Sequence, residues 1–237
     1  GMQSFGEDEN TLYYSDNEKL FKWDLQKNSV VDLGLPASQF SVSAVGQTLA
    51  LSDRQRVGIL NTANQTFNQL TVPIGYSDKM ALSPDGSNLF TLEYQKNEVK
   101  IWNTATGEQT GSLVPVGDFA QNNFDAIVPS PDGKNLAEYE NNGGYQAIVW
   151  DLVEKSSKIL SSDKAITALC FSGDGSLIVT GLDDGSVSFY DAQTLTLINN
   201  LPLGTQSIVS MTISADNRYL VLSDNKGRAY VYTIIES

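Results

Sequence analysis

Hydrophobic and polar positions alternate along this chain in short runs of about four to eight residues, each bounded by Gly, Asp or Asn. Residues 165–201 show the pattern clearly: "AITALCFS", the turn "GDG", "SLIVTGL", the turn "DDGS", "VSFYD" and "TLTLINNL". Runs rich in β-branched and aromatic residues between turn-forming residues are typical of strands joined by hairpins. No segment carries a helical period of adequate length. The pattern therefore predicts an all-β chain in which four short strands follow one another in each such stretch.

A serine-led turn recurs at nearly constant intervals. Its serine stands at Ser43, Ser83, Ser130, Ser172 and Ser214, so that successive copies are 40, 47, 42 and 42 residues apart. Two copies read "SPDG" and a third reads "SGDG", which makes repeat markers of Ser83, Asp85, Gly86, Ser130, Asp132, Gly133, Asp174 and Gly175. Gly ends four of the five copies and Asn ends the fifth, and both residues tolerate a left-handed turn. Self-similarity at this period predicts a repeat architecture.

A large apolar or aromatic residue forms a second marker with the same period. It stands at Trp23, Leu60, Trp102, Trp150, Tyr190 and Tyr232, and Asp or Asn follows it in five of these six places. Two markers with one period predict six repeats, over approximately residues 2–33, 39–70, 77–114, 124–160, 165–201 and 207–235.

The first three strands of a repeat are apolar on both faces, as expected when neighbouring sheets cover a small sheet on either side. A ring of four-stranded antiparallel blades, about 40 residues each, meets this requirement. We therefore predict that residues 1–237 form a single domain, a six-bladed β-propeller that is either complete or lacks a strand.

Two stretches carry a resemblance to a known family. Residues 82–108, "LSPDGSNLFTLEYQKNEVKIWNTATGE", and residues 129–152, "PSPDGKNLAEYENNGGYQAIVWDL", resemble WD40-like repeats. The segments "TVPIG", "LVPVG" and "NLPLG" are similar to the Pro and Gly after the fourth strand of bacterial YVTN-type propeller repeats. The chain contains no histidine, so it lacks the Gly-His pair common in WD repeats and the hydrogen-bond network which that pair implies.

Ring closure raises a question at the two ends of the sequence. Gly1, before Met2, is interpreted as a residue left by cloning, and Met2 to Phe5 can serve as the first strand of repeat one. The chain stops at "RAYVYTIIES", directly after the third strand of repeat six. Repeat six either stays three-stranded, or takes its fourth strand from a longer native chain, or takes residues 2–5 at the expense of repeat one. We expect residues 2–6 to pair with a terminal blade, and a monomer in which a free edge permits association.

The charge balance excludes several kinds of partner. With 28 acidic and 15 basic side chains, the formal net charge is −13, and no three consecutive residues are basic. Phosphate backbones and anionic membrane surfaces would be repelled, so neither nucleic acid nor a membrane is an expected partner. No run of about 18 apolar residues predicts a membrane span, and no signal peptide is recognised. The compartment is therefore left open: cytoplasmic by default, or exported with a trimmed leader.

The sequence offers little catalytic chemistry. There is no histidine, no phosphate-binding glycine loop and no zinc-ligand spacing, and Cys170 is interpreted as a packed small hydrophobe. Asp183 with Asp184, and "GEDE" at 6–9, are paired carboxylates by proximity. Asp184 is interpreted as a turn cap, as are Asp16, Asp53 and Asp224 in the matching turns. We expect no enzyme, no metal and no cofactor; the alternative is an enzyme or ligand binder that uses carboxylates at the channel mouth.

The expected site lies where the loops of some repeats are longer than those of the others. Counting between markers predicts a long interblade loop at 115–124 and a long loop between second and third strands at 139–146, both on one face around blades three and four. The residues expected to bind a protein partner there are Tyr76, Tyr94, Phe119, Asn122, Asn123, Asn142 and Tyr145. Aromatic residues are enriched at binding hot spots; the alternative is that one or two of them fold back to cap the blade ends. The prediction is a non-enzymatic protein-interaction scaffold whose partner is a protein of unknown identity.

Overall fold

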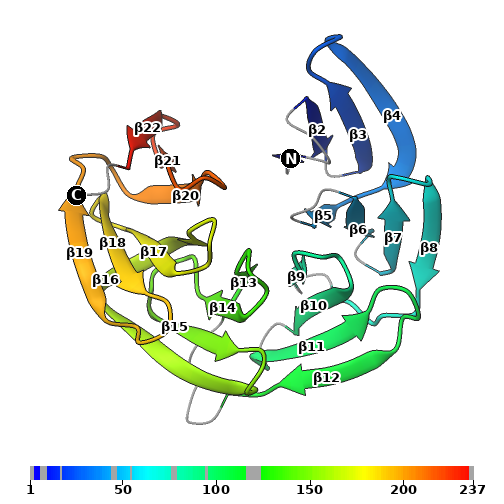
Figure 1. The fold of residues 1–237 in the computed structure, drawn as a ribbon. Helices are drawn as coiled ribbons and strands as arrows, with labels where there is room; N and C mark the ends of the chain where they lie inside the picture. The colour runs from blue at the N-terminus through cyan, green and yellow to red at the C-terminus, as the bar shows by residue number, and fades with distance from the viewer. Residues whose placement is uncertain are drawn as a thin grey trace. The chain divides into compact units, whose positions relative to one another are not determined.

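The structure is a computed structural model that consists of strands and turns (Figure 1). It describes residues 3–5, 10–16, 18–43, 47–53, 55–75, 79–93, 96–115 and 124–234. The chain separates into two compact units, Gly1–Val114 and Pro115–Ser237. The sheets of each unit are antiparallel and connected in sequence order, because short turns join consecutive strands.

The first unit contains three four-stranded sheets. Its first sheet consists of β1 (Gln3–Phe5), β2 (Thr11–Ser15), β3 (Lys19–Asp24) and β4 (Ser29–Pro36). The second consists of β5 (Gln39–Val42), β6 (Thr48–Ser52), β7 (Val57–Asn61) and β8 (Thr66–Leu70). The third consists of β9 (Lys79–Leu82), β10 (Asn88–Glu93), β11 (Glu98–Asn103) and β12 (Gln109–Leu113).

Apolar side chains from adjacent sheets form the core of the first unit. Tyr13 and Leu20 of the first sheet pack with Phe40 and Leu49 of the second. A second cluster joins sheets two and three and includes Trp102, which is 6% exposed. The inner strands β6 and β10 are almost entirely buried, whereas the outer strand β8 is exposed over four of its five residues. Sheets buried on both faces explain why these strands read as apolar runs.

The second unit contains a seven-stranded and a three-stranded sheet. The larger sheet consists of β13 (Ala126–Pro129), β14 (Asn135–Tyr139), β15 (Gly144–Asp151), β16 (Ser156–Phe171), β17 (Leu177–Leu182), β18 (Ser186–Asp191) and β19 (Leu197–Pro202). The smaller sheet consists of β20 (Ile208–Ile213), β21 (Tyr219–Asp224) and β22 (Ala229–Thr233). Two apolar clusters hold the unit together, one around Ile166 and Ile178 and the other around Ile208 and Leu220.

One long strand merges what the sequence predicts as two sheets. Residues 156–161 of β16 pair with β15 as a fourth strand, and residues 166–171 pair with β17 as a first strand. The chain stays extended between these two segments. The expected separation between residues 160 and 165 is therefore wrong at the level of hydrogen bonding, although each half of β16 plays the part expected of it.

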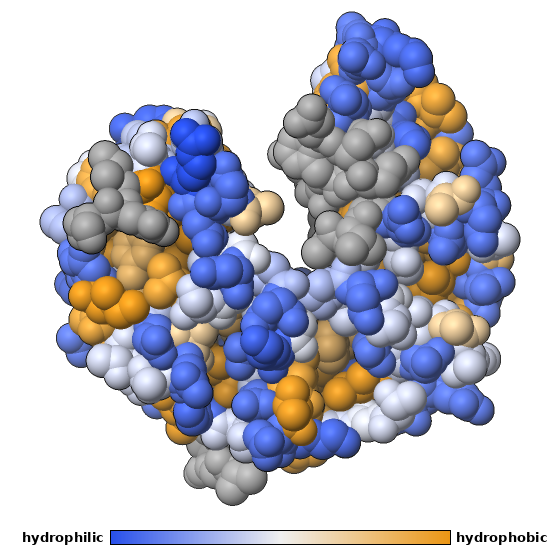
Figure 2. All heavy atoms as spheres, viewed as in Figure 1, coloured by the Kyte–Doolittle hydropathy of each residue, from blue (hydrophilic) through white to orange (hydrophobic). Residues whose placement is uncertain are grey.

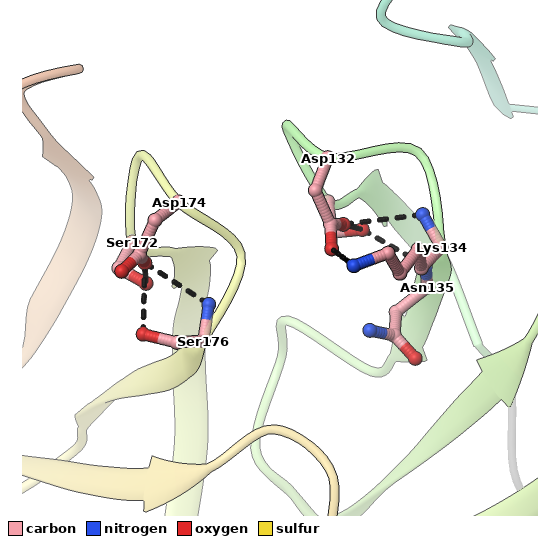
Figure 3. A network of polar contacts seen from close by, with 7 residues as sticks. Asp132, Lys134, Asn135, Ser172, Asp174 and Ser176 are labelled. Carbon is pink, nitrogen blue, oxygen red and sulfur yellow. Dashed lines mark hydrogen bonds and ion pairs between the residues drawn. The ribbon is translucent and has the colours of Figure 1, made fainter.

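The serine-led turns share one hydrogen-bonding scheme. In the fourth repeat the Ser130 hydroxyl donates to Asp132 at 2.6 Å and accepts the Asn135 N–H at 2.8 Å. Figure 3 shows this turn together with the next one, where Ser172 bonds Asp174 at 2.6 Å. The same pair of bonds closes the turns at Ser83 and Ser214. The recurrence of these residues in the sequence thus has a local cause, because one hydroxyl satisfies two partners in each turn.

Several expectations can now be compared with the fold. The all-β class and the antiparallel sheets are confirmed, and three of the sheets have the expected four strands, whereas closure into one six-bladed ring and the single domain stay predictions. Gln3–Phe5 pairs with β2, so the proposal that this segment completes repeat six at the expense of repeat one is wrong. Glu7 to Glu9 lie outside the described residues. In the described part of the chain the last sheet has three strands, and β22 pairs only with β21.

Candidate functional site

A tight turn joins β14 to β15 in the second unit. The sequence predicted a long loop over 139–146, but β14 extends to Tyr139 and β15 begins at Gly144, which leaves four residues between them. The additional residues lengthen β15 to eight positions. Its pairing with β16 shifts register between Gly144, which pairs with Ile166, and Gln146, which pairs with Ser161, so Tyr145 lies at an irregularity where residues 162–165 of β16 are the additional ones. Tyr145 has no partner in this register and is 57% exposed.

Asp125 holds this turn in place. One carboxylate oxygen accepts the Asn141 N–H at 2.8 Å, and the other accepts the Asn142 side-chain amide at 3.0 Å. Gly143 has a φ of +117°, a backbone conformation that residues with side chains rarely adopt. The turn at residues 140–143 is therefore tied to the segment that precedes β13. A binding residue beside it would need little ordering when a partner binds.

The turn borders a hollow of about 430 Å³ in the second unit. Its lining comes from three places in the chain: Phe124 before β13, Glu140 with the segment from Gly143 to Gln146, and Ser161 with Ser162 in β16. Phe124 is 1% exposed and Glu140 is half-buried, while Tyr145 stands at the rim. We call this hollow the Tyr145 hollow. It brings an aromatic ring, a carboxylate and small polar groups to one end of strands β14 and β15.

A larger hollow of about 620 Å³ lies at the opposite end of the same strands. It lies beside the serine-led turns, and its lining includes Asp132, Lys134, Asp151, Asp174, Asp191 and Gln193. The sequence predicted only a structural role for these turns and did not predict a hollow beside them. Lys158 donates to the Gln193 carbonyl at 2.7 Å, and Lys134 pairs with Asp132 at 3.3 Å. Many of its polar groups are thus already engaged with one another.

The carboxylates of the turns are occupied as backbone caps. Asp151 accepts N–H groups from Val153 and Glu154, and Asp191 accepts those of Gln193 and Thr194. This explains why Asp or Asn follows the aromatic marker. Asp184 likewise accepts the backbone and hydroxyl groups of Ser186, and Asp16, Asp53 and Asp224 accept backbone N–H groups in the matching turns.

Hydrogen bonding lowers the pKa of several turn carboxylates, among them Asp174, Asp184 and Asp191. The Ser172 hydroxyl and then the Ser176 N–H hold the pKa of Asp174 at about 2, well below its usual value. A general acid at neutral pH needs the opposite shift. Among carboxyl groups in the described part of the chain, Glu138 is the one whose pKa is raised, to about 8, because it is buried; a hydrogen bond from Trp150 partly opposes the shift. Burial also raises the pKa of the Cys170 thiol to about 12, which makes it a poor nucleophile.

The tryptophan markers differ in what their indoles contact. Trp102 donates to the Thr91 hydroxyl at 2.9 Å, and Trp150 donates to Glu138. The indole nitrogen of Trp23 is buried with no hydrogen-bond partner among the described residues.

Two of the seven residues expected to bind a partner can be placed. Tyr145 stands at the rim of its hollow, and the side chain of Asn142 is engaged by Asp125. Tyr76, Tyr94, Phe119, Asn122 and Asn123 lie outside the described residues. Sequence reasoning missed Asp125 and Glu140; the run "ENNGG" at 140–144 was the available signal, since Asn and Gly mark a tight turn.

The surface composition agrees with the acidic sequence. Figure 2 shows hydrophilic residues over much of the visible surface, with smaller hydrophobic areas between them. Within the described ranges, no group of three or more His, Cys, Asp or Glu side chains is placed to hold a metal ion. The same ranges hold no helix long and apolar enough to cross a membrane.

Comparisons with known proteins place this chain among repeat proteins. The family model of the anaphase-promoting complex subunit 4 WD40 domain matches residues 145–216. A WD repeat-containing protein 91 homolog from Dictyostelium discoideum is 27% identical over 68% of this chain and 23% of its own length. Eukaryotic translation initiation factor 3 subunit I from Vanderwaltozyma polyspora is 24% identical over 87% of this chain and 59% of its own length. The Protein LST8 homolog of Drosophila melanogaster is 28% identical over 64% and 48%, respectively.

These relatives are longer than the part of them that the chain matches. The aligned regions span between about a quarter and three fifths of their lengths. The family model matches residues 145–216, a stretch that includes the long strand β16.

Proposed function

On the premise that this chain belongs to the WD40-repeat β-propeller family, we propose that it is a non-enzymatic scaffold that binds another protein. WD40 propeller proteins generally serve as protein-interaction scaffolds. One relative is, by its name, a subunit of a multi-subunit factor. The partner of this chain is therefore proposed to be a protein.

The Tyr145 hollow is the proposed contact surface of the second unit. The observation that carries this choice is the exposed ring of Tyr145 beside a turn that Asp125 clamps. Tyrosine supplies a large contact area at a low cost in conformational entropy, and such residues are enriched at binding hot spots. The proposal extends to the face that carries the interblade loops and the loops between second and third strands, centred on repeats three and four.

The enzymatic alternative receives less support from the described carboxylates. The turn carboxylates serve as caps, with the pKa of Asp174 lowered, and the buried Glu138 accepts a hydrogen bond from Trp150 within its own sheet. A binding function requires no raised pKa and no metal. The alternative of a carboxylate-based site at the channel mouth stays a prediction.

Affinity capture with variants of the full chain tests the proposed function. Immobilised protein is exposed to lysate of its source organism, and captured proteins are identified by mass spectrometry. Replacing Tyr145 and Phe119 by Ala together should abolish capture of a specific partner while the melting temperature stays within a few degrees of wild type. The control is Tyr219→Ala, which removes another exposed tyrosine, on β21.

The controls decide between binding and structural roles. Capture that Tyr219→Ala retains and the double variant loses supports the proposal. Equal loss of stability and of capture in the double variant would show that these aromatic residues are structural. Capture that survives the double variant would place the contact surface elsewhere.

A further inference from the structure

The chemistry of the Tyr145 hollow indicates what kind of group it can receive. Glu140, on its wall, is half-buried, and its carboxylate has no ion pair or hydrogen bond with the described side chains. The side chain lies across the start of β15: a methyl group added at Gly144 would stand 2.9 Å from the Glu140 Cβ and 3.3 Å from its Oε2. Glycine at position 144 therefore leaves room for this carboxylate at the wall of the hollow.

Among the described residues, no Lys or Arg forms an ion pair with this carboxylate. Lys164, on the neighbouring part of β16, pairs with Asp184 at 3.6 Å. Lys158, farther along the same strand, is bonded to the Gln193 carbonyl. A half-buried carboxylate that no described side chain neutralises favours a cationic ligand, because partial desolvation strengthens the attraction between opposite charges.

The other groups of the hollow favour arginine over lysine. The Tyr145 ring is exposed and can stack on a planar guanidinium, as aromatic rings commonly do with arginine. The Gln146 side-chain carbonyl and the Ser161 hydroxyl supply further acceptors in the same lining. A guanidinium has five N–H donors in a fixed plane, so it can bond a carboxylate and a neighbouring acceptor at once.

Other side chains fit the hollow less well. An acidic side chain would meet both Glu140 and a chain of net charge −13. An apolar side chain would bury the Glu140 carboxylate without giving it a partner, which is costly. The negative charge of Glu140 and the aromatic ring of Tyr145 thus both favour an arginine side chain.

We propose that the Tyr145 hollow is a slot for an arginine side chain of the protein partner, with the guanidinium against the Tyr145 ring and bonded to the Glu140 carboxylate. This inference rests on the proposed binding function and specifies the chemistry of its partner. The partner is expected to present arginine on an exposed segment, and the contact is expected to weaken with salt.

Titration of the full chain with a blocked amino acid tests the slot directly. The probe is N-acetyl-arginine methylamide, and its matched control is the neutral isostere N-acetyl-citrulline methylamide, both at constant ionic strength. Amide resonances of ¹⁵N-labelled protein report binding at Gly143, Gly144 and Gln146. The arginine probe should shift these resonances with saturation in the millimolar range, and the citrulline probe should bind about tenfold more weakly or not at all.

Variants test separately the two groups that are proposed to bind the guanidinium, the Glu140 carboxylate and the Tyr145 ring. Glu140→Gln and Tyr145→Ala should each weaken binding of the arginine probe by roughly three- to tenfold. Glu154→Gln, which removes an exposed carboxylate from the turn after β15, should leave it unchanged. Thermal melting checks that each variant is folded.

The outcomes distinguish failure of the slot from failure of the proposed function. If both probes behave alike, or if Glu140→Gln has no effect on binding of the arginine probe, the slot is wrong. If in addition Tyr145→Ala still abolishes capture of a protein partner, the binding surface stands and its ligand is not arginine. If the arginine probe binds as expected but no variant changes partner capture, the slot is real and the proposed function of this face is wrong.

Discussion

Glu138 shows how one residue can change the character of a repeat. Leu89 pairs with Trp102 and Leu136 pairs with Trp150, so Thr91 and Glu138 occupy equivalent positions two residues later. Thr91 meets the indole N–H with a hydroxyl, whereas Glu138 meets it with a fully buried carboxyl group. The second oxygen of Glu138 has no hydrogen-bond partner among the described groups. A neutral acid is far less costly in this place than an anion.

The stability of the protein is expected to depend on pH through Glu138. Burial raises the pKa of Glu138 from 4.5 to about 8, so the folded state holds a proton that the unfolded chain loses. The contribution is fully present below pH 4.5 and is lost as the pH rises through about 8. Between these limits the melting temperature of wild type should fall by roughly 5–10 °C relative to Glu138→Gln, which cannot ionise.

Thermal melts across this pH range check the expectation. Glu154→Gln serves as the control because it removes an exposed carboxylate of the same sheet, and its curve should parallel that of wild type. Parallel curves for wild type and Glu138→Gln would mean that Glu138 does not retain its proton on folding.

At the scale of the element, the serine-led turn is the repeating unit of stability. Its hydroxyl bridges an Asp side chain to the N–H of the strand that follows, and the same scheme closes the turns of repeats three to six. Neighbouring turns also bond each other: the Asn217 side chain accepts the Gly173 N–H at 2.6 Å. A residue of this local turn motif thus also forms a hydrogen bond between neighbouring repeats.

The same substitution in two copies of this turn should have unequal effects. Ser172 is 2% exposed, and loss of its hydroxyl leaves the Leu177 N–H without this acceptor and Asp174 without this donor, although Asp174 keeps its bonds from Ser176. Ser172→Ala should cost about 1–2 kcal/mol and lower the melting temperature by roughly 2–6 °C. Ser214→Ala removes the same bonds from an exposed turn, where water can replace them, and should cost less.

Calorimetry or chemical denaturation of both variants compares these costs. A larger loss for Ser214→Ala than for Ser172→Ala would show that burial does not set the value of the bond. Equal losses would show that the turn acts through its local geometry alone.

At the scale of the whole molecule, net charge dominates the electrostatics. A formal charge of −13 over 237 residues produces repulsion that opposes the compact state. In most ion pairs of the described residues the cationic side chain is exposed; in the Lys19–Asp32 pair both side chains are, at 55% and 40%. Exposed pairs contribute little to stability, so screening of repulsion should outweigh screening of attraction.

Salt is therefore expected to stabilise the protein. Raising NaCl from about 20 mM to about 300 mM should increase the melting temperature by a few degrees. Differential scanning fluorimetry in NaCl and in KCl at matched ionic strength measures the effect, and the two salts should agree because the cause is screening. A decrease would mean that attractive pairs such as Arg56 with Asp53 matter more than the net charge.

Local chemistry explains how much of the fold could be predicted. A turn such as 172–175 is built from bonds between residues at most five positions apart, so its sequence reports its structure directly. The same holds for the Asp or Asn after each aromatic marker. The candidate site was predictable in part: Tyr145 is exposed near a turn of Asn and Gly, but the clamp by Asp125 links residues 16 and 17 positions apart.

The sequence by itself determined the all-β class, the repeat period, the strand order within each repeat and the residues that close the turns. All of these depend on contacts between near neighbours in the chain. Only the tertiary structure decided that β16 runs unbroken through two repeats, that the expected loop at 139–146 is a short turn followed by a register shift between β15 and β16, and that Glu138 is buried beside Trp150. It also brought Phe124, Glu140, Tyr145 and Ser161 around one hollow. Those features depend on which strands, distant from one another in the sequence, come into contact. The hydrophobic periodicity of the sequence does not specify those contacts.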